Sequence, residues 1–178
     1  FTPIMKSPVV CNNAASCVSM RFNEDTSVSI TMSAIDMGQG ASTALAQIAA
    51  EALKIPLEKI RISRRVSTEY TPYEWQTVAS RTTWTLGRAI IRAANRAIQK
   101  FKEMAAKILQ IDINELIYDG DQVSSKSKSI SLKEMVMGHL DIEGHLTGGP
   151  ILVHGHYIPP NLTFPDKETG QGNLASEW

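Results

Sequence analysis

The pentad Asp36-Met37-Gly38-Gln39-Gly40 is the first segment whose residue types suit a chemical task. It follows an expected strand and precedes an expected helix. Free backbone N–H groups and the dipole at a helix start favour a phosphate or another anion, and glycine lets a ligand approach the backbone closely. The Gln39 amide adds a donor and an acceptor suited to the edge of a heterocycle. The pentad therefore indicates a site that holds an anionic ligand rather than one that attacks a substrate.

The same residues also fit a simpler interpretation. The run Gly38-Gln39-Gly40-Ala41-Ser42-Thr43 lacks the third glycine of a dinucleotide fingerprint and the lysine of a P-loop. A tight turn that only starts a helix would use the same residues. Taken by itself, the pentad favours such a turn over a binding site.

A second polar segment, Val78-Ala79-Ser80-Arg81-Thr82-Thr83-Trp84-Thr85, lies at the start of the longest expected helix. Its serine and threonines are natural N-caps, so capping of that helix explains them without any ligand. Its hydroxyls, its backbone N–H groups and the Arg81 guanidinium could also hold a phosphate or an oxygen-rich ring. The residues alone leave both interpretations open.

Other reactive side chains form no recognised catalytic set. No Gly-x-Ser-x-Gly elbow and no His-Glu-x-x-His pair occurs in the sequence. His154 and His156 alternate on one face of an expected strand and could bind a metal. Without a third ligand, a surface or core role is favoured for both. His139 and His145 have no informative context.

A basic stripe lies along the longest expected helix. Its members stand at i, i+4 spacing and are Arg88, Arg92, Arg96 and Lys100. The stripe could meet an acidic partner or a nucleic acid. A solvated face, or one covered by other domains, is the favoured interpretation.

The spacing of apolar residues predicts the elements that position these segments. Strict alternation predicts a hairpin of two strands, at residues 14–22 and 27–35, around a polar turn. After Gly40 the period changes to three and four, which predicts a helix of about three turns closed by Pro56. Residues 59–66 alternate again and suit a further strand.

The strongest helical pattern runs from about Thr83 to Leu109 and carries one apolar stripe. The remaining expected elements are strands at 113–118 and 122–124, a helix from the capping box of Ser131 and Glu134 to about Gly138, a β-like stretch at 145–158 and an irregular end at 159–178. Because hairpins interleave with helices, we predict an α+β fold, a small mixed sheet with two main helices, rather than a doubly wound parallel sheet.

Composition narrows the function classes. The 178 residues suit one domain, or two small lobes that share a core. The zero net charge argues against a general nucleic-acid binder, and no apolar run of about 18 residues suggests a membrane span. Two cysteines, Cys11 and Cys17, are too few for an iron–sulfur or zinc site. We therefore expect a cytoplasmic protein without nucleic-acid or membrane partners.

The order of these motifs resembles the molybdopterin-binding (large) subunit of the xanthine dehydrogenase/aldehyde oxidase family. The resemblance covers roughly residues 7–124. Its segments are Asp36–Thr43, the helix Ala44–Leu53, the stretch 71–81 with the sequence Thr-Pro-Tyr-Glu-Trp-Gln-Thr-Val-Ala-Ser-Arg, and the Ala-rich helix that begins near Gly87-Arg88-Ala89. The stretches 155–160 and 166–170 resemble the family more loosely. The resemblance divides the chain into a cofactor-contacting core, residues 1–124, and a less regular part of the same domain, residues 125–178.

The resemblance also implies which residues surround the cofactor. Met37, Gly38, Gln39 and Gly40 would touch the pyranopterin and its phosphate. The second wall of the site would comprise Ala79, Ser80, Arg81, Thr82 and Thr83. In the family the cofactor's own dithiolene holds the molybdenum, so we expect no metal ligand in this chain.

By the same resemblance, the complete enzyme would hydroxylate a small aldehyde or an N-heterocycle with oxygen from water. Its cofactors would be molybdopterin, in plain or cytosine-dinucleotide form, and FAD and [2Fe-2S] clusters on partner domains or subunits. The family's glutamate base stands in a Gly-Val-Gly-Glu context, which is absent from this sequence. We therefore expect an excised segment without catalytic residues of its own, which is inactive in isolation.

Two other functions are considered beside this one. The first is a non-catalytic interaction domain that uses the basic stripe to bind a protein partner. The second is an anion- or nucleotide-binding module that uses Gly38–Gly40 without molybdopterin.

Overall fold

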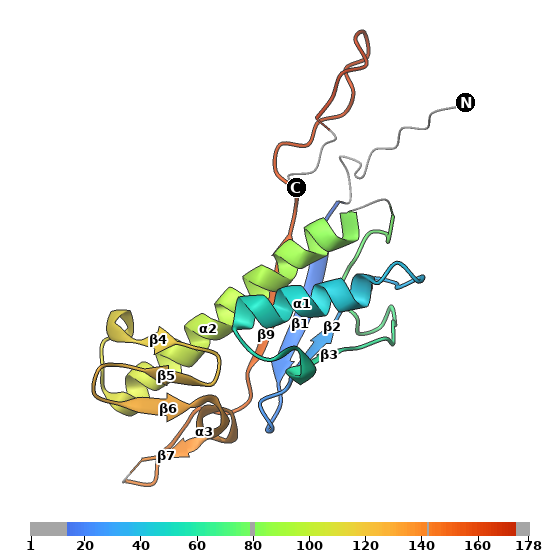
Figure 1. Ribbon diagram of the computed structural model, residues 1–178. Coiled ribbons are helices and arrows are strands. Elements are labelled where there is room, and N and C mark those ends of the chain that lie inside the picture. Colours follow the sequence, from blue (N-terminus) through green and yellow to red (C-terminus); the bar gives the residue numbers. More distant parts are fainter. Residues whose placement is uncertain (1–13, 79–80, 142, 174–178) are drawn as a thin grey trace.

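The computed structural model describes residues 14–78, 81–141 and 143–173. A four-stranded sheet with the order β3-β2-β1-β9 forms its centre (Figure 1). Strands β1 (Ser16–Phe22) and β2 (Val28–Thr31) make the predicted hairpin. Strand β9 (Leu152–Tyr157) pairs antiparallel with β1, whereas β3 (Ile60–Ile62) runs parallel to β2. The sheet is mixed, and the predicted α+β fold is confirmed.

Two long helices cover one face of this sheet. Helix α1 (Ala41–Leu53) packs against β3 and α2, and helix α2 (Gly87–Leu109) packs against β9 and β1. Alternate residues of the strands, such as Met20 and Ile30, are buried beneath them. Both helices begin at the same end of the molecule, at which the pentad also lies (Figure 1). The sheet and the helices therefore bring the two predicted segments to one end of the fold.

Gly155 sets how closely α2 approaches the sheet. A Cβ atom built on this residue would lie 2.0 Å from the Ala89 carbonyl oxygen and 2.9 Å from the Ala93 Cβ. Real side chains do not tolerate such distances to backbone atoms, so only glycine allows this contact. The position of the second predicted segment, which leads into α2, depends on it.

A smaller sheet packs beside the C-terminal half of α2 and consists of β4 (Ile117–Tyr118), β5 (Gln122–Ser124) and β6 (Ser129–Ser131). Helix α3 (Leu132–Met137) follows and has the predicted capping box of Ser131 and Glu134. Strands β7 (His139–Leu140) and β8 (Leu146–Thr147) form a short ladder. The described part of the chain beyond Tyr157 contains no helix or strand, as predicted.

Several predicted strands are shorter than expected, and short 3-10 turns replace the start of two of them. The strand predicted at 27–35 ends at Thr31. Helix η1 (Leu57–Lys59) follows Pro56 and replaces the first residue of the strand predicted at 59–66, which retains only β3. Helix η3 (Ile113–Glu115) is capped by the Asp112 carboxylate, which accepts the Asn114 N–H, so the strand at 113–118 retains only β4. In both places a local cap or proline overrides the alternating pattern.

The basic stripe has a specific role in this fold. Arg92 and Arg96 donate hydrogen bonds to the carbonyl oxygens of His156 and His154, at 3.1 and 2.6 Å. Those carbonyls belong to β9, which is an edge strand of the main sheet. All four basic residues are exposed, but two of them hold the sheet edge rather than projecting freely.

Among the described residues, no helix has the length and apolar composition needed to cross a membrane.

Candidate functional site

The Asp36 carboxylate organises the loop between β2 and α1. It accepts the N–H groups of Ser42 at 2.9 Å, Gly38 at 3.1 Å and Gly40 at 3.2 Å. These bonds, that from the Ser42 N–H most of all, hold the pKa of Asp36 below its ordinary value. The first segment was expected to leave such N–H groups free for an external anion. Three of them instead bind a carboxylate of the chain, which satisfies the same electrostatic preference.

The Gln39 side chain also stabilises the loop from within. Its Oε1 atom accepts the Met37 N–H at 2.6 Å, and its Nε2 group donates to the Ile35 carbonyl oxygen at 3.0 Å. Gly38 and Gly40 have φ angles of 103° and 78°, which only glycine adopts readily. No atom lies within 4 Å of the position that a Cβ atom would take on either glycine. The predicted requirement for glycine thus has two sources, a left-handed backbone and an open approach.

The second segment splits into an inward and an outward part. Ala79 and Ser80 lie outside the described residues. Arg81 is fully buried, and its guanidinium binds the Glu74 carboxylate and the carbonyl oxygens of Gln76 and Ala14. The expectation that this guanidinium could hold a phosphate is therefore wrong, because the group is directed into the protein. Any contact of the Arg81 backbone with a cofactor stays a prediction.

Thr82 and Thr83 lie in η2 (Thr82–Leu86), a π-helical turn that precedes α2. The long helix was predicted to begin directly at about Thr83. Such wide turns occur mostly inside α-helices and are frequent at functional sites. The turn leaves Thr83 exposed and Thr82 only 5% exposed.

The two predicted segments meet at one pocket of about 240 Å³. Its lining residues are Met37, Gln39, Ala41, Thr77, Val78, Thr82 and Thr83. Four of the nine predicted site residues therefore line a single cavity, although some forty positions separate them in the sequence. Thr77 and Ala41 were not predicted, and their positions directly beside the two motifs are the signal that would have included them.

One buried polar atom of a residue that lines this pocket lacks a partner. Among the described residues, the buried Thr82 Oγ1 accepts and donates no hydrogen bond. A buried hydroxyl without a partner costs about 1–3 kcal/mol in proteins. Native structures rarely retain such a group unless a ligand or water binds it. The Thr82 hydroxyl is therefore a candidate ligand contact.

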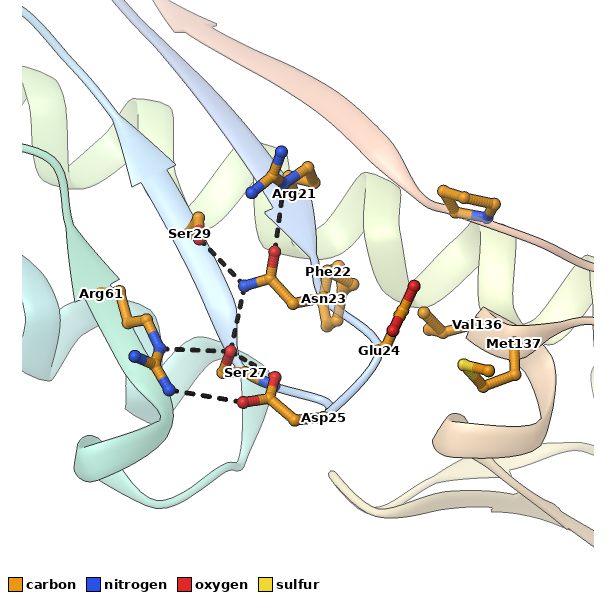
Figure 2. A pocket seen from close by; sticks show the side chains of 11 residues that line it. Arg21, Phe22, Asn23, Glu24, Asp25, Ser27, Ser29, Arg61, Val136 and Met137 are labelled. Atoms are coloured by element: carbon orange, nitrogen blue, oxygen red, sulfur yellow. Dashed lines mark hydrogen bonds and ion pairs between the residues drawn. The ribbon is translucent and has the colours of Figure 1, made fainter.

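A larger cavity lies elsewhere, at the turn of the β1–β2 hairpin. It measures about 840 Å³ and reaches from that turn to Val136 and Met137 of α3 (Figure 2). Its polar side chains bind one another: Asn23 donates to Ser27 and Ser29, and Arg61 pairs with Asp25 at 3.3 Å. Because these groups are already partnered by one another, we place the candidate site at the smaller pocket.

The histidines form no compelling metal site in the part of the chain that the structure describes. His154 and His156 lie on the exposed face of β9, and the His154 Nδ1 atom is hydrogen-bonded to Ser19 Oγ at 2.8 Å. His145 approaches the carboxylates of Asp141 and Glu143, but all three are exposed in the turn between β7 and β8. The surface role predicted for the β9 pair agrees with this exposure.

Comparison with known proteins gives a consistent result. The chain matches the family model of the molybdopterin cofactor-binding domain over residues 2–178. It is 33% identical over 150 residues to the carbon monoxide dehydrogenase large chain of Hydrogenophaga pseudoflava, a match that covers 82% of this chain and 18% of that protein. It is 35% identical over 149 residues to xanthine dehydrogenase 1 of Arabidopsis thaliana, with 84% and 9% covered.

Solved structures agree with these relatives. Carbon monoxide dehydrogenase from Oligotropha carboxidovorans superimposes with a TM-score of 0.70 at 29% identity, which covers 82% of this chain and 18% of that one. Quinoline 2-oxidoreductase from Pseudomonas putida 86 gives 0.67 at 26% identity, with 82% and 19% covered. The chain thus spans less than a fifth of the length of these proteins. It belongs to the molybdopterin cofactor-binding domain family, and carbon monoxide dehydrogenase large chains and xanthine dehydrogenases are among its relatives.

Proposed function

We propose that the pocket between the pentad and η2 forms part of the molybdopterin site of a longer molybdenum-containing hydroxylase. The observation that carries the proposal is the buried, unpartnered Thr82 hydroxyl in a pocket shared by both predicted segments. The family match over residues 2–178 supports it independently. Of the nine residues predicted to contact the cofactor, Met37, Gln39, Thr82 and Thr83 have the strongest structural support.

The donor set of the pocket fits a pterin. The Gln39 amide and the hydroxyls of Thr77, Thr82 and Thr83 are neutral groups that both donate and accept. Such groups match the alternating donors and acceptors along a heterocycle edge without introducing a charge. The open space beside Gly38 and Gly40 lets a planar ring approach the backbone.

An anionic part of the ligand would not meet free N–H groups at the start of α1, as the sequence led us to expect. The Asp36 carboxylate already accepts three N–H groups at the start of α1. A phosphate at those N–H groups would have to displace a like charge. The proposed phosphate contacts therefore lie toward Gln39 and η2 rather than at the Asp36 side of the loop.

When bound, the cofactor supplies a molybdenum centre at which a substrate is oxidised. This chain's part is to bind and orient the pterin. The proposed reaction is hydroxylation of a small aldehyde or an N-heterocycle; a relative named for nicotine falls within that set, and one named for carbon monoxide widens it. The FAD and [2Fe-2S] groups, the cytosine-dinucleotide form of the cofactor and a cytoplasmic location complete the proposal.

The interaction-domain alternative loses its basis in this structure. Two of the four basic residues on which it rested, Arg92 and Arg96, hydrogen-bond to the edge of the chain's own sheet. Their charges serve to hold β9 in place.

The test is the molybdenum and pterin content of the full-length protein, purified with its natural partner chains from a host that makes the cofactor. Near-stoichiometric molybdenum with a dithiolene pterin is the expected result. A Gln39→Ala variant should retain less of both, because its loop loses two hydrogen bonds and the pocket loses an amide. Gln47→Ala, an exposed glutamine of α1, is the matched control. Absence of molybdenum from the wild-type protein would refute the proposal, and unchanged content in Gln39→Ala would refute the role of Gln39.

A further inference from the structure

Arg81 is the most deeply buried charged residue described in the fold, with 0% of its surface exposed. Its Nη1 group binds the Glu74 carboxylate and the Gln76 carbonyl oxygen, the latter at 2.7 Å. Its Nη2 group binds the Ala14 carbonyl oxygen at 2.9 Å and Ser16 Oγ at 3.2 Å. One guanidinium thus joins the start of the long helical segment to β1 and to the loop before it.

The partners of this guanidinium border the pocket directly. Gln76 immediately precedes Thr77 and Val78, and Arg81 immediately precedes Thr82 and Thr83. All four following residues line the pocket. Both pairs of pocket residues are therefore attached, within two residues, to one buried guanidinium.

A second set of bonds holds the backbone at the same point. Thr85 Oγ1 donates to the Arg81 carbonyl oxygen at 2.9 Å and accepts from Ser16 Oγ at 2.7 Å. The Trp75 ring lies 5.6 Å from the guanidinium carbon. The side chain and the carbonyl group of Arg81 are thus both fixed, which determines the direction in which the next residue, Thr82, points.

Stability alone is a weak reason for such a pair. Burial raises the pKa of Glu74, and the Arg81 charge beside it opposes that rise. Replacement of a buried ion pair by apolar residues of similar volume is often neutral or stabilising. What an apolar pair would not reproduce is the set of directional bonds from a planar fork to several separate segments.

We propose that Arg81 and Glu74 are positioning residues that set the orientation of four pocket residues, Thr77, Val78, Thr82 and Thr83, toward the cofactor. They act through Thr82 and do not touch the cofactor themselves. The inference rests on the proposed function of the pocket. It reassigns Arg81 from direct contact with a phosphate to the support of residues that make the contacts.

The test uses the full-length, cofactor-loaded protein and two measurements. The first is the rate at which molybdenum and pterin are released after dilution. The second is the hydrogen-exchange protection of the η2 amides compared with that of β1 and β2. The main variant is Arg81→Met combined with Glu74→Leu, which replaces the ion pair by apolar side chains of similar volume. The control is Arg61→Met with Asp25→Leu, which removes the exposed ion pair of Figure 2.

The main variant should fold, keep the protection of β1 and β2, and release the cofactor roughly 10–100-fold faster, the range seen when supporting residues of a bound group are lost. The control should release it at the wild-type rate. Arg81→Lys keeps the charge but not the fork, and should also release faster. If the double variant does not fold, the release rate of Arg81→Lys tests the positioning role in its place.

The outcomes distinguish failure of the positioning role from failure of the proposed function. If the wild-type protein carries molybdenum and either Arg81 variant releases it at the wild-type rate with unchanged η2 protection, the positioning role is wrong and the pocket assignment stands. If release and the protection of β1 and β2 change in proportion, the pair is only structural and the inference is overturned. If the wild-type protein carries no cofactor, the proposed function fails and this inference fails with it.

Discussion

Thr82→Val should stabilise the apoprotein and weaken its binding of the cofactor. Valine has nearly the shape of threonine and the same branching at Cβ, so packing and rotamer preference change little. The Thr82 hydroxyl is buried and has no partner among the described residues. Its removal relieves a penalty of about 1–3 kcal/mol, and we expect a gain near the lower end, about 1 kcal/mol, because 5% of the residue is still exposed. The same change removes a proposed cofactor contact.

The matched control is Thr85→Val, three residues further along. Thr85 is fully buried, but its hydroxyl donates to the Arg81 carbonyl oxygen and accepts from Ser16. Loss of this hydroxyl removes two buried hydrogen bonds, one to the Arg81 carbonyl oxygen and one from Ser16, so the variant should lose about 1–3 kcal/mol. The two variants share their chemistry and differ in sign, which separates the role of the hydroxyl from the effect of the substitution.

Hydrogen exchange of the apoprotein is the suitable assay because it reads the stability of η2 locally within a long protein. A change of about 1.4 kcal/mol alters the protection tenfold. Protection of the η2 amides should rise several-fold in Thr82→Val and fall in Thr85→Val, while the molybdenum content of Thr82→Val falls. The reasoning is refuted if Thr82→Val loses protection as Thr85→Val does, or if it retains the cofactor at the wild-type level.

Three further predictions concern the frame of the site. Gly155→Ala should cost about 3 kcal/mol in urea unfolding, because its Cβ would lie 2.0 Å from the Ala89 carbonyl oxygen; a neutral effect would show that α2 moves away without cost. Asp36→Asn should lower the thermal stability at pH 7. The pKa of Asp36 is lowered in the folded state, so this difference should persist above about pH 4 and shrink as the pH falls through that lowered value; a difference that grows on acidification would contradict the loop assignment. Ser131→Ala should cost about 1 kcal/mol in local exchange of α3 without changing molybdenum content; a loss of metal would show that α3 supports the site.

The sequence alone determined the main helices, the first hairpin and their order. Alternation over residues 27–35 and the three-four period after Gly40 reflect interactions between near neighbours; the structure has a strand over the first part of that range, Val28–Thr31, and a helix at Ala41–Leu53. The capping box at Ser131 is equally local and is present as predicted. The glycines of the pentad were predicted to let a ligand approach the backbone; the structure adds a second reason for them, since both adopt positive φ angles.

Only the tertiary structure decided what individual polar groups do. Arg81 looks like a phosphate ligand in the sequence, yet its guanidinium is enclosed by the nearby Glu74 and by backbone that precedes β1, which is distant in the chain. The basic stripe is exposed, as the favoured interpretation had it, but the sequence does not reveal that Arg92 and Arg96 reach the carbonyl oxygens of a strand some sixty residues later. Periodicity records which face of an element is apolar. It carries no record of which distant donor meets which acceptor, because that pairing exists only once the chain has folded.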